Sequence, residues 1–267
     1  MAAKKKAKKK TAKKSASKEI AVGWQAQLAA HAKEGKAPKE KALTGDYIST
    51  KGAKFSLGGA VLGREIDCCI LGWNFEKSWY DSAFVDGEAS APACFAISYD
   101  EDEMTPHETS PNMQGDSDGM CEGCELNEWG SGKGEGKACA DRRRLALVVE
   151  GTNGDMELKM LNISPSSLKN WKGFINGIEK QGIHVMQAAV NIHFDEDSTA
   201  AYPPICFEFL NEITNESTLD ATAALLPEAT TLLEQPYDVS NYEKPGGEKK
   251  TAKKKAKKKS NKKSKFS

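Results

Sequence analysis

The sequence predicts a mainly β domain with flanking helices, an α+β fold, between two lysine-rich tails. Three observations predict it. Short apolar segments bounded by turn residues recur through the middle of the chain, which is typical of strands. A few longer segments have the apolar spacing of amphipathic helices. Lysine is concentrated at the two ends, so the folded domain is expected between them.

Both ends of the chain are strongly basic. Residues 1–18 hold nine lysines and residues 249–265 hold eleven, and neither segment contains an acidic residue. Residues 19–248 therefore keep 18 basic residues against all 38 acidic ones, a charge near −20. Lysine self-repulsion and few apolar residues predict disorder. We expect disordered basic tails at residues 1–18 and 236–267 around a core domain at residues 19–235.

The first half of the core begins with an amphipathic helix over residues 20–32. Two strand segments follow at residues 54–63 and 65–81, and an acidic, proline-containing loop occupies residues 98–119. Strand character returns immediately after the cysteine-rich segment, at residues 142–151 and 155–163.

The second half opens with a helix that has Ser164 as candidate N-cap and ends at Gly182. Strands are expected at residues 185–194 and 203–210, and a last helix at 218–233. Five or so short strands, a helix before the last pair and a loop inserted between strands favour a small OB-like barrel. The concave strand face of such a barrel suits single-stranded nucleic acid.

Cysteines mark the inserted loop. Cys121 and Cys124 share one Cys-x2-Cys turn, Cys139 follows a glycine-rich stretch, and Cys94 lies upstream. Four thiolates suit tetrahedral Zn²⁺, and they fill its coordination sphere, which favours a structural site over a catalytic one. The sequence predicts a structural zinc loop over about residues 94–144, with these four cysteines as ligands.

Three other interpretations of the cysteines stay open. They could be ordinary free thiols in a flexible loop. Cys121 and Cys124 could form a redox pair, although that motif normally opens a helix after a strand. His107 could replace Cys94 as the fourth ligand.

No catalytic constellation stands out, and we expect a protein that is not an enzyme. The sequence has no Gly-x-Ser-x-Gly and no His-Glu-x-x-His motif. The glycine-rich stretch lacks the phosphate-loop spacing, because Ser131 and Ala138 occupy its first and last positions.

Seven cysteines without a signal-peptide pattern, and no apolar run of about 18 residues, predict a cytoplasmic protein with no membrane partner.

Basic and aromatic residues predict contact with nucleic acid. Lysine tails bind phosphates and release counterions, without regard to sequence. Cations of the zinc loop would neutralise phosphates while aromatic rings stack on bases, although core packing is the alternative for the rings. The candidate residues are Lys133, Lys137, Arg142, Arg143, Arg144, Trp73, Trp79, Tyr80 and Trp129.

Several strings resemble a family of tailed-phage proteins that are encoded among replication and recombination genes, some identified as single-stranded DNA-binding proteins. The resemblance spans about residues 20–235, and its strings lie at residues 74–80, 92–94, 121–144, 163–171 and 202–209. It implies an OB-like binding protein with a cysteine-rich metal loop, located in the host cytoplasm. Cys94, Cys121, Cys124, Cys139 and Arg142–Arg144 match the family's cysteine and basic positions.

These observations together predict a single-stranded DNA-binding protein without sequence specificity, of phage-type replication or recombination, with Zn²⁺ as a structural cofactor. Replication or recombination proteins are further expected partners. Two alternatives remain: an architectural protein that coats duplex DNA through its lysine tails, and an adaptor or inhibitor that uses its acidic core in protein–protein contacts.

Overall fold

The computed structural model describes residues 47–82, 90–151, 154–240 and 242. Contacts divide this part of the chain into two units. Unit 1 comprises residues 47–74 and 143–235, and unit 2 comprises residues 75–142 and 236–242, with the gaps just given. The helix expected at residues 20–32 and most of the two expected tails lie outside the described residues.

The strands form one seven-stranded sheet and a separate hairpin. The sheet order is β1-β7-β6-β4-β8-β9, with β5 paired to β4. The hairpin is formed by β2 (Phe55–Leu57) and β3 (Ala60–Gly63). The strands of the sheet are β1 (Tyr47–Ile48), β4 (Glu65–Trp79), β5 (Cys94–Ser98), β6 (Ala140–Glu150), β7 (Met156–Ile163), β8 (Ala188–Phe194) and β9 (Ile205–Glu212).

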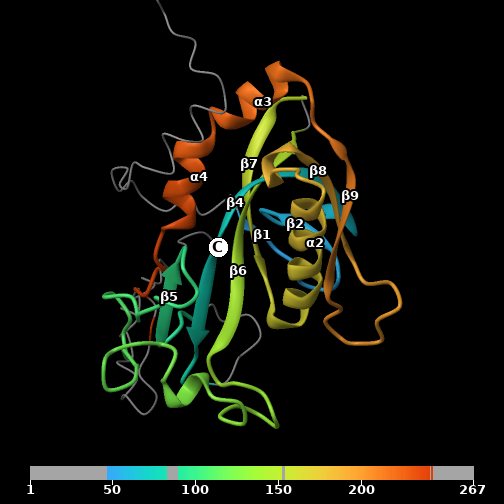
Figure 1. Cartoon of the computed structure of the whole chain (residues 1–267). Helices are drawn as coiled ribbons and strands as arrows, with labels where there is room; N and C mark the ends of the chain where they lie inside the picture. Colours follow the sequence, from blue (N-terminus) through green and yellow to red (C-terminus); the bar gives the residue numbers. More distant parts are fainter. Residues whose placement is uncertain (1–46, 83–89, 152–153, 241, 243–267) are drawn as a thin grey trace, which may run out of the picture. The chain divides into compact units, whose positions relative to one another are not determined.

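The predicted fold class is confirmed at its coarser level. The described chain is mainly β with a few helices, and the strand segments expected from periodicity are present (Figure 1). In β8, for example, alternate residues are buried, which is the period of a strand with one covered face. The OB-like barrel is not confirmed, because the described pairings leave the sheet open at β1 and β9.

Unit 1 holds the larger apolar core. Helix α2 (Leu168–Lys180) buries Trp171, Phe174 and Ile178, and Figure 1 shows it lying alongside the strands. Trp73 of β4 meets Trp171 edge to face, with ring centroids 5.3 Å apart. The Trp73 ring is therefore a packing residue of this core.

The last predicted helix is divided in two. Helix α3 (Glu216–Ala223) begins at Asn215, whose side chain accepts a hydrogen bond from the Thr218 amide at 3.0 Å. Helix α4 (Leu226–Leu233) starts afresh with Pro227 in its first turn. Proline has no N–H to continue the preceding helix, so the break falls just before it.

Two buried polar side chains bind the C-terminal end of α4. Asn74 donates from Nδ2 to the Leu233 carbonyl at 2.5 Å. The guanidinium of Arg144 donates to the same carbonyl at 3.2 Å and to the Gln235 carbonyl at 2.5 Å. Carbonyls at the end of a helix have no partner within it, and a cation suits the negative end of the helix dipole.

Unit 2 pairs the end of β4 with β5 in antiparallel register, Phe75 opposite Ser98 and Trp79 opposite Cys94. Its buried apolar cluster is small and consists of Ala96, Met104 and Cys121, with Phe75 packed against it. Long loops make up most of the rest, and they enclose the cysteines.

The described part of residues 236–242 packs on unit 2, where the sequence predicts the beginning of a disordered tail. The Tyr237 ring meets Phe95 edge to face at 5.1 Å, and its hydroxyl donates to the Glu76 carboxylate. Tyr242 donates to Asp81 at 2.5 Å. Two tyrosines, each offering an apolar ring and a polar tip, supply these contacts in an otherwise polar segment. Within the described ranges, no helix is long and apolar enough to span a membrane.

Replacing Arg144 should destabilise unit 1. Arg144→Ala leaves the carbonyls of Leu233 and Gln235 without their charged donor, and we expect a loss of about 2–3 kcal/mol in the free energy of unfolding. Urea denaturation followed by circular dichroism measures it. The control is Lys169→Ala, a substitution at an exposed position of α2. Equal midpoints for the two variants would contradict the role given to Arg144.

Stability should fall at alkaline pH because of the thiol of Cys69. Burial raises the pKa of Cys69 to about 12, whereas an unfolded cysteine titrates near 8.5. The stabilisation is complete below the unfolded pKa and decreases as pH rises towards 12, by about 1.4 kcal/mol per pH unit. Cys69→Ala should therefore show a shallower loss of stability between pH 8 and 10 than the wild type. Parallel curves over that interval would refute the effect.

Candidate functional site

The four cysteines predicted as ligands come from three separate segments of unit 2. Cys94 begins β5, Cys121 and Cys124 lie on one turn, and Cys139 immediately precedes β6. The chain thus brings positions up to 45 residues apart in the sequence to one place.

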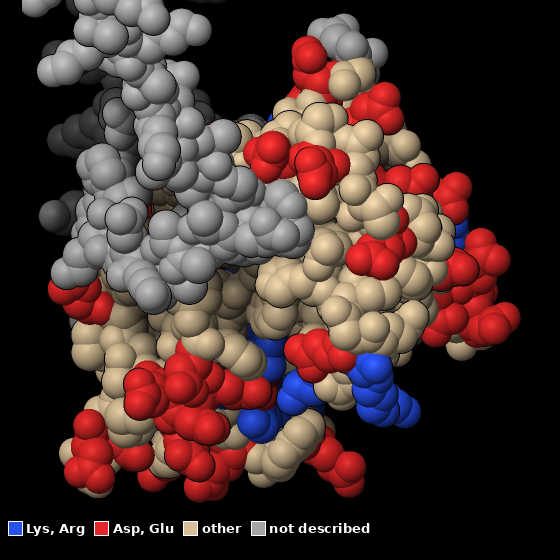
Figure 2. Space-filling model, turned by 45° about the horizontal axis from the view of Figure 1, so that its top comes forward, with Lys and Arg blue, Asp and Glu red and all other residues tan. Residues whose placement is uncertain are grey.

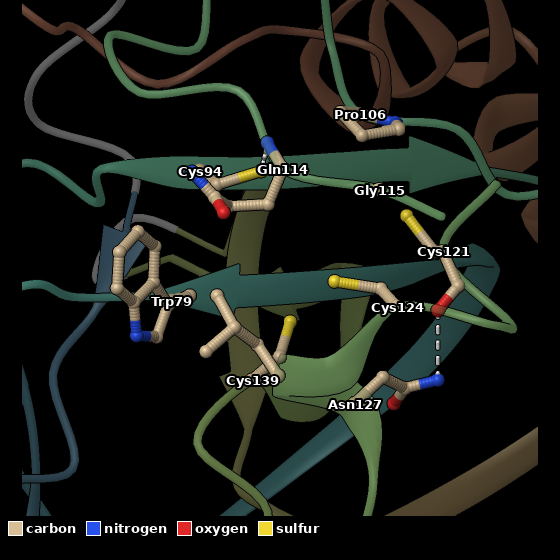
Figure 3. Close-up of a pocket in the computed structure, with 10 residues that line it drawn as sticks. Trp79, Cys94, Pro106, Gln114, Gly115, Cys121, Cys124, Asn127 and Cys139 are labelled. Atoms are coloured by element: carbon tan, nitrogen blue, oxygen red, sulfur yellow. Dashed lines mark hydrogen bonds between the residues drawn. The ribbon is translucent and has the colours of Figure 1, made fainter. Parts of the chain in front are cut away.

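All four line a single cavity (Figure 3). The picture shows their sulfur atoms facing the same space. The cavity has a volume of about 20 Å³, which is room for one water-sized species. Its other lining residues are Trp79, Pro106, Gln114, Gly115, Leu126 and Asn127. Cys94 is among the lining residues and His107 is not, so the cavity favours Cys94 over the alternative fourth ligand.

His107 has a different set of neighbours. Its ring stacks on Phe95 with centroids 5.0 Å apart, and its Nδ1 atom lies 2.9 Å from the Thr109 hydroxyl. The His107 imidazole therefore packs against Phe95 and Thr109 and does not line the cysteine cavity.

Backbone hydrogen bonds shape the segment that carries three of the cysteines. The Cys124 amide donates to the Cys121 carbonyl at 3.4 Å, which closes the Cys-x2-Cys turn. The Cys139 amide donates to the Leu126 carbonyl at 2.8 Å and returns the chain to this turn. The Gln114 amide donates to the Cys94 sulfur at 3.3 Å, the kind of contact that stabilises a thiolate.

A partly buried polar network lies beside the cysteine turn. The Lys77 ammonium, on β4, donates to the Asp141 carboxylate and, at 3.2 Å, to Asn127 Oδ1. Lys137 donates to the same two side chains, at 3.0 Å and 3.1 Å. Asn127 in turn donates from Nδ2 to the Cys121 carbonyl at 2.9 Å. One amide side chain therefore joins the two lysines to the cysteine turn.

The thiols lie close enough to influence one another. Burial is the main cause that raises the pKa of Cys121 to about 11 and of Cys139 to about 12, and it also raises the pKa of Cys94. The charges of neighbouring thiols raise these pKa values further, whereas the Lys77 ammonium lowers those of Cys121 and Cys139. The cavity therefore brings together neutral thiols whose ionised forms would repel one another, with a cation beside two of them.

The side chains are not yet arranged as a metal site. Among the described residues, no group of three or more His, Cys, Asp or Glu side chains is placed so that it could hold a metal ion as it stands. The cavity therefore collects the four thiols on its wall without a completed set of metal ligands among the described residues.

The structure separates the predicted nucleic-acid residues into buried and exposed groups. Arg143 and Arg144 are only 3% and 2% exposed, and Trp73 belongs to the core of unit 1. These three do not present a surface to a ligand. Half-buried Arg142 donates to the Ser78 hydroxyl at 3.0 Å, and Trp79 lines the cysteine cavity.

The exposed group lies mainly on the loop between Cys124 and Cys139. Trp129 is 80% exposed and Lys133 is exposed. The half-buried Lys137 ammonium, which is paired with Asp141, lies 5.5 Å from the centre of the Trp129 ring. Tyr80, immediately after β4, is also exposed. The predicted site is thus reduced to Trp129 and Lys133 with Lys137 beside the ring, and a tyrosine elsewhere in unit 2.

Glycines hold the Trp129 loop in a closed form. The amides of Gly130 and Gly132 both donate to the Gly136 carbonyl, at 3.1 Å and 2.9 Å. Gly130 has a φ of 87°, in the left-handed region that glycine favours. A Cβ atom on Gly132 would lie 2.7 Å from the Lys137 carbonyl. The glycines therefore allow a close backbone approach that fixes the loop.

Sequence reasoning missed Lys77, Asn127 and Asp141. Lys77 follows Glu76 in a predicted strand, and a lysine at such a position is usually expected to face solvent. Its burial depends on residues 50 and 64 positions away. Local sequence carries no signal for this burial, because Glu76 and Ser78 flank Lys77 in the strand.

Comparisons of the chain with protein families, with curated proteins and with solved structures found no significant match. A function therefore has to be inferred from the residues and their arrangement.

Removing the Asp141 carboxylate should destabilise unit 2. Asp141→Asn leaves the Lys77 ammonium, which is 7% exposed, without its anion, and we expect a cost of about 3 kcal/mol in unfolding free energy. The matched control is Glu128→Gln, an exposed position on the same loop. Chemical denaturation of both variants tests this, and a loss below about 1 kcal/mol, as for a surface ion pair, would refute it.

Proposed function

We propose that the protein binds single-stranded DNA, with its lysine-rich ends supplying electrostatic affinity and Trp129 supplying a surface on which bases stack. The observation that supports this best is the exposure of Trp129, at 80%, on a hydrogen-bonded loop. Base–aromatic stacking contributes about 1–3 kcal/mol per base and accepts any base, because every base has a π-face.

The setting of Trp129 suits a nucleic-acid strand. The Lys137 ammonium lies 5.5 Å from the ring centre, and exposed Lys133 follows on the same loop. A cation beside a stacking ring can contact the phosphate of the base that is stacked there. The loop therefore offers one base and one or two phosphates a place to bind.

The folded part of the chain supplies little electrostatic attraction of its own. In the described part of unit 2, Asp and Glu outnumber Lys and Arg by 15 to 4. Figure 2 shows more acidic than basic side chains on the face in view. Stacking needs no net charge, and screening limits repulsion from remote carboxylates to about 8–10 Å. The nine lysines of residues 1–18 and the eleven of residues 249–265 then provide the attraction to phosphate.

A second candidate is an architectural protein that coats duplex DNA through its ends alone. The burial of Arg143 and Arg144 favours it, as does the packing of the partly buried Trp73 ring against the core, because these contacts make all three residues poor candidates for a binding surface. The two candidates differ in whether Trp129 contributes and in whether single strands are preferred.

Replacing Trp129 in the full-length chain distinguishes them. Trp129→Ala should weaken binding to labelled oligo-dT by about 5- to 100-fold, the equivalent of losing one stacked base. The salt dependence and the affinity for duplex DNA should stay unchanged, since both come from the lysines. Trp129→Phe should retain most of the affinity. Tyr202→Ala, at an aromatic residue that is 75% exposed in unit 1, is the matched control.

Fluorescence anisotropy at several salt concentrations measures these affinities. Equal binding of single and double strands, unaffected by Trp129→Ala, would leave only the tail-driven candidate. Absence of binding at about 50 mM salt, where electrostatic contacts are strong, would remove both.

A further inference from the structure

We propose that Cys94, Cys121, Cys124 and Cys139 bind one Zn²⁺ ion as thiolates and so form a structural metal site in unit 2. This inference goes beyond DNA binding and does not depend on it. It rests on four thiols on the wall of one cavity, on hydrogen bonds that already shape the metal-binding turn, and on the small apolar core of the unit.

The cavity has the composition and size for a single ion. Four cysteines supply a complete tetrahedral set of soft ligands, which Zn²⁺ binds at about 2.3 Å. A volume of about 20 Å³ is room for a single small species such as one ion. Trp79, Pro106 and Leu126 cover the cavity with apolar groups, and a dry shell of this kind keeps water from competing with the sulfurs.

The backbone is prepared for the ion before it binds. A Cys-x2-Cys turn closed by the Cys124 amide presents two sulfurs from one turn of chain. The Gln114 amide donates to the Cys94 sulfur at 3.3 Å, and Cys139 is returned to the turn by its bond to Leu126. Rotation of the cysteine side chains is then the main adjustment that coordination requires.

The negative charge of a zinc–tetrathiolate centre would be partly offset by the lysines that are hydrogen-bonded to the cysteine turn through Asn127. When four thiols lose their protons to solvent and bind Zn²⁺, the centre keeps two negative charges. Lys77 and Lys137 carry two positive charges and Asp141 one negative charge, so the network adds one net positive charge beside the cysteine turn, to which Asn127 joins it. Asp141 orients both ammonium groups. Supporting groups of this kind stabilise the ligands of metal sites in general.

Unit 2 also has a physical need for a cross-link. In the described part of the unit, one buried apolar cluster of Ala96, Met104 and Cys121 has Phe75 against it, and Phe95 is the one large apolar side chain buried outside that cluster. Folded units with so little apolar core usually depend on disulfides or a structural metal. All seven cysteines of the chain are free thiols, so a metal ion is the remaining cross-link.

The test uses the reduced, metal-free full-length chain with Zn²⁺ or Co²⁺ as the added ion. Zn²⁺ should protect four thiols from alkylation, and peptide mapping should identify them as Cys94, Cys121, Cys124 and Cys139, while Cys206 reacts with or without metal. Co²⁺ should bind one equivalent and give the visible absorption of a tetrahedral tetrathiolate site.

Variants then assign the ligands. Cys94→Ser should weaken Zn²⁺ binding by more than about tenfold, since even supporting residues cost that much. Cys206→Ser and His107→Ala should bind as tightly as the wild type. Because Cys94→Ser could unfold unit 2, the protection pattern in the wild-type chain decides the case independently.

Three results would overturn the proposal: no change in alkylation on adding Zn²⁺, protection of a set that omits any of the four, or a coloured iron site in the untreated protein. Each is separable from failure of the DNA proposal, because none of these measurements contains nucleic acid.

Discussion

The apolar cluster in the described part of unit 2 is small, so polar contacts beside the cysteine turn contribute much of what holds its loops. Three buried residues and one partly buried phenylalanine form its cluster, so long loops must be fixed by polar contacts. The strongest of these join Lys77, Lys137, Asp141 and Asn127 beside the cysteine turn. A partly buried network of this kind stabilises a structure best when every member has a partner, and each of these four does.

The same network couples the cysteine cavity to the surface of the loop. Lys137 bonds to Asp141 and Asn127 and also lies over the ring of Trp129. Asn127 holds the turn that carries Cys121. Whatever fixes the cysteines therefore also fixes the position of the exposed tryptophan. In this account an ion in the cavity and a base on the loop act through one set of side chains, without touching each other.

Much of the fold could be predicted from periodicity, and parts of it could not. The alternation in β8 and the apolar stripe of α2 follow directly from residue spacing. Strand β5 was not predicted, because its five residues begin at Cys94, which was assigned to the zinc loop. The single helix expected at 218–233 is broken before Pro227. Residues 236–242 were assigned to a tail, but Tyr237 and Tyr242 reach partners 161 positions away, which local composition cannot reveal.

In the candidate site, too, local sequence selected some residues that the structure brings together and could not predict the effect of tertiary packing on others. Spacing alone selected the four cysteines, and the structure brings all four to one cavity. Charge and aromaticity alone selected Arg143, Arg144 and Trp73, which are not available to a ligand. A sequence shows which residues could carry a charge or stack a base. It does not show whether tertiary packing has already used them, as the bonds of Arg144 to α4 illustrate.

X-ray absorption spectroscopy of the full-length chain loaded with Zn²⁺ tests the central claim most directly. The account predicts a first shell of four sulfur atoms at about 2.3 Å with no nitrogen or oxygen ligand. A first shell that contains imidazole, carboxylate or water, or fewer than four sulfurs, would contradict it.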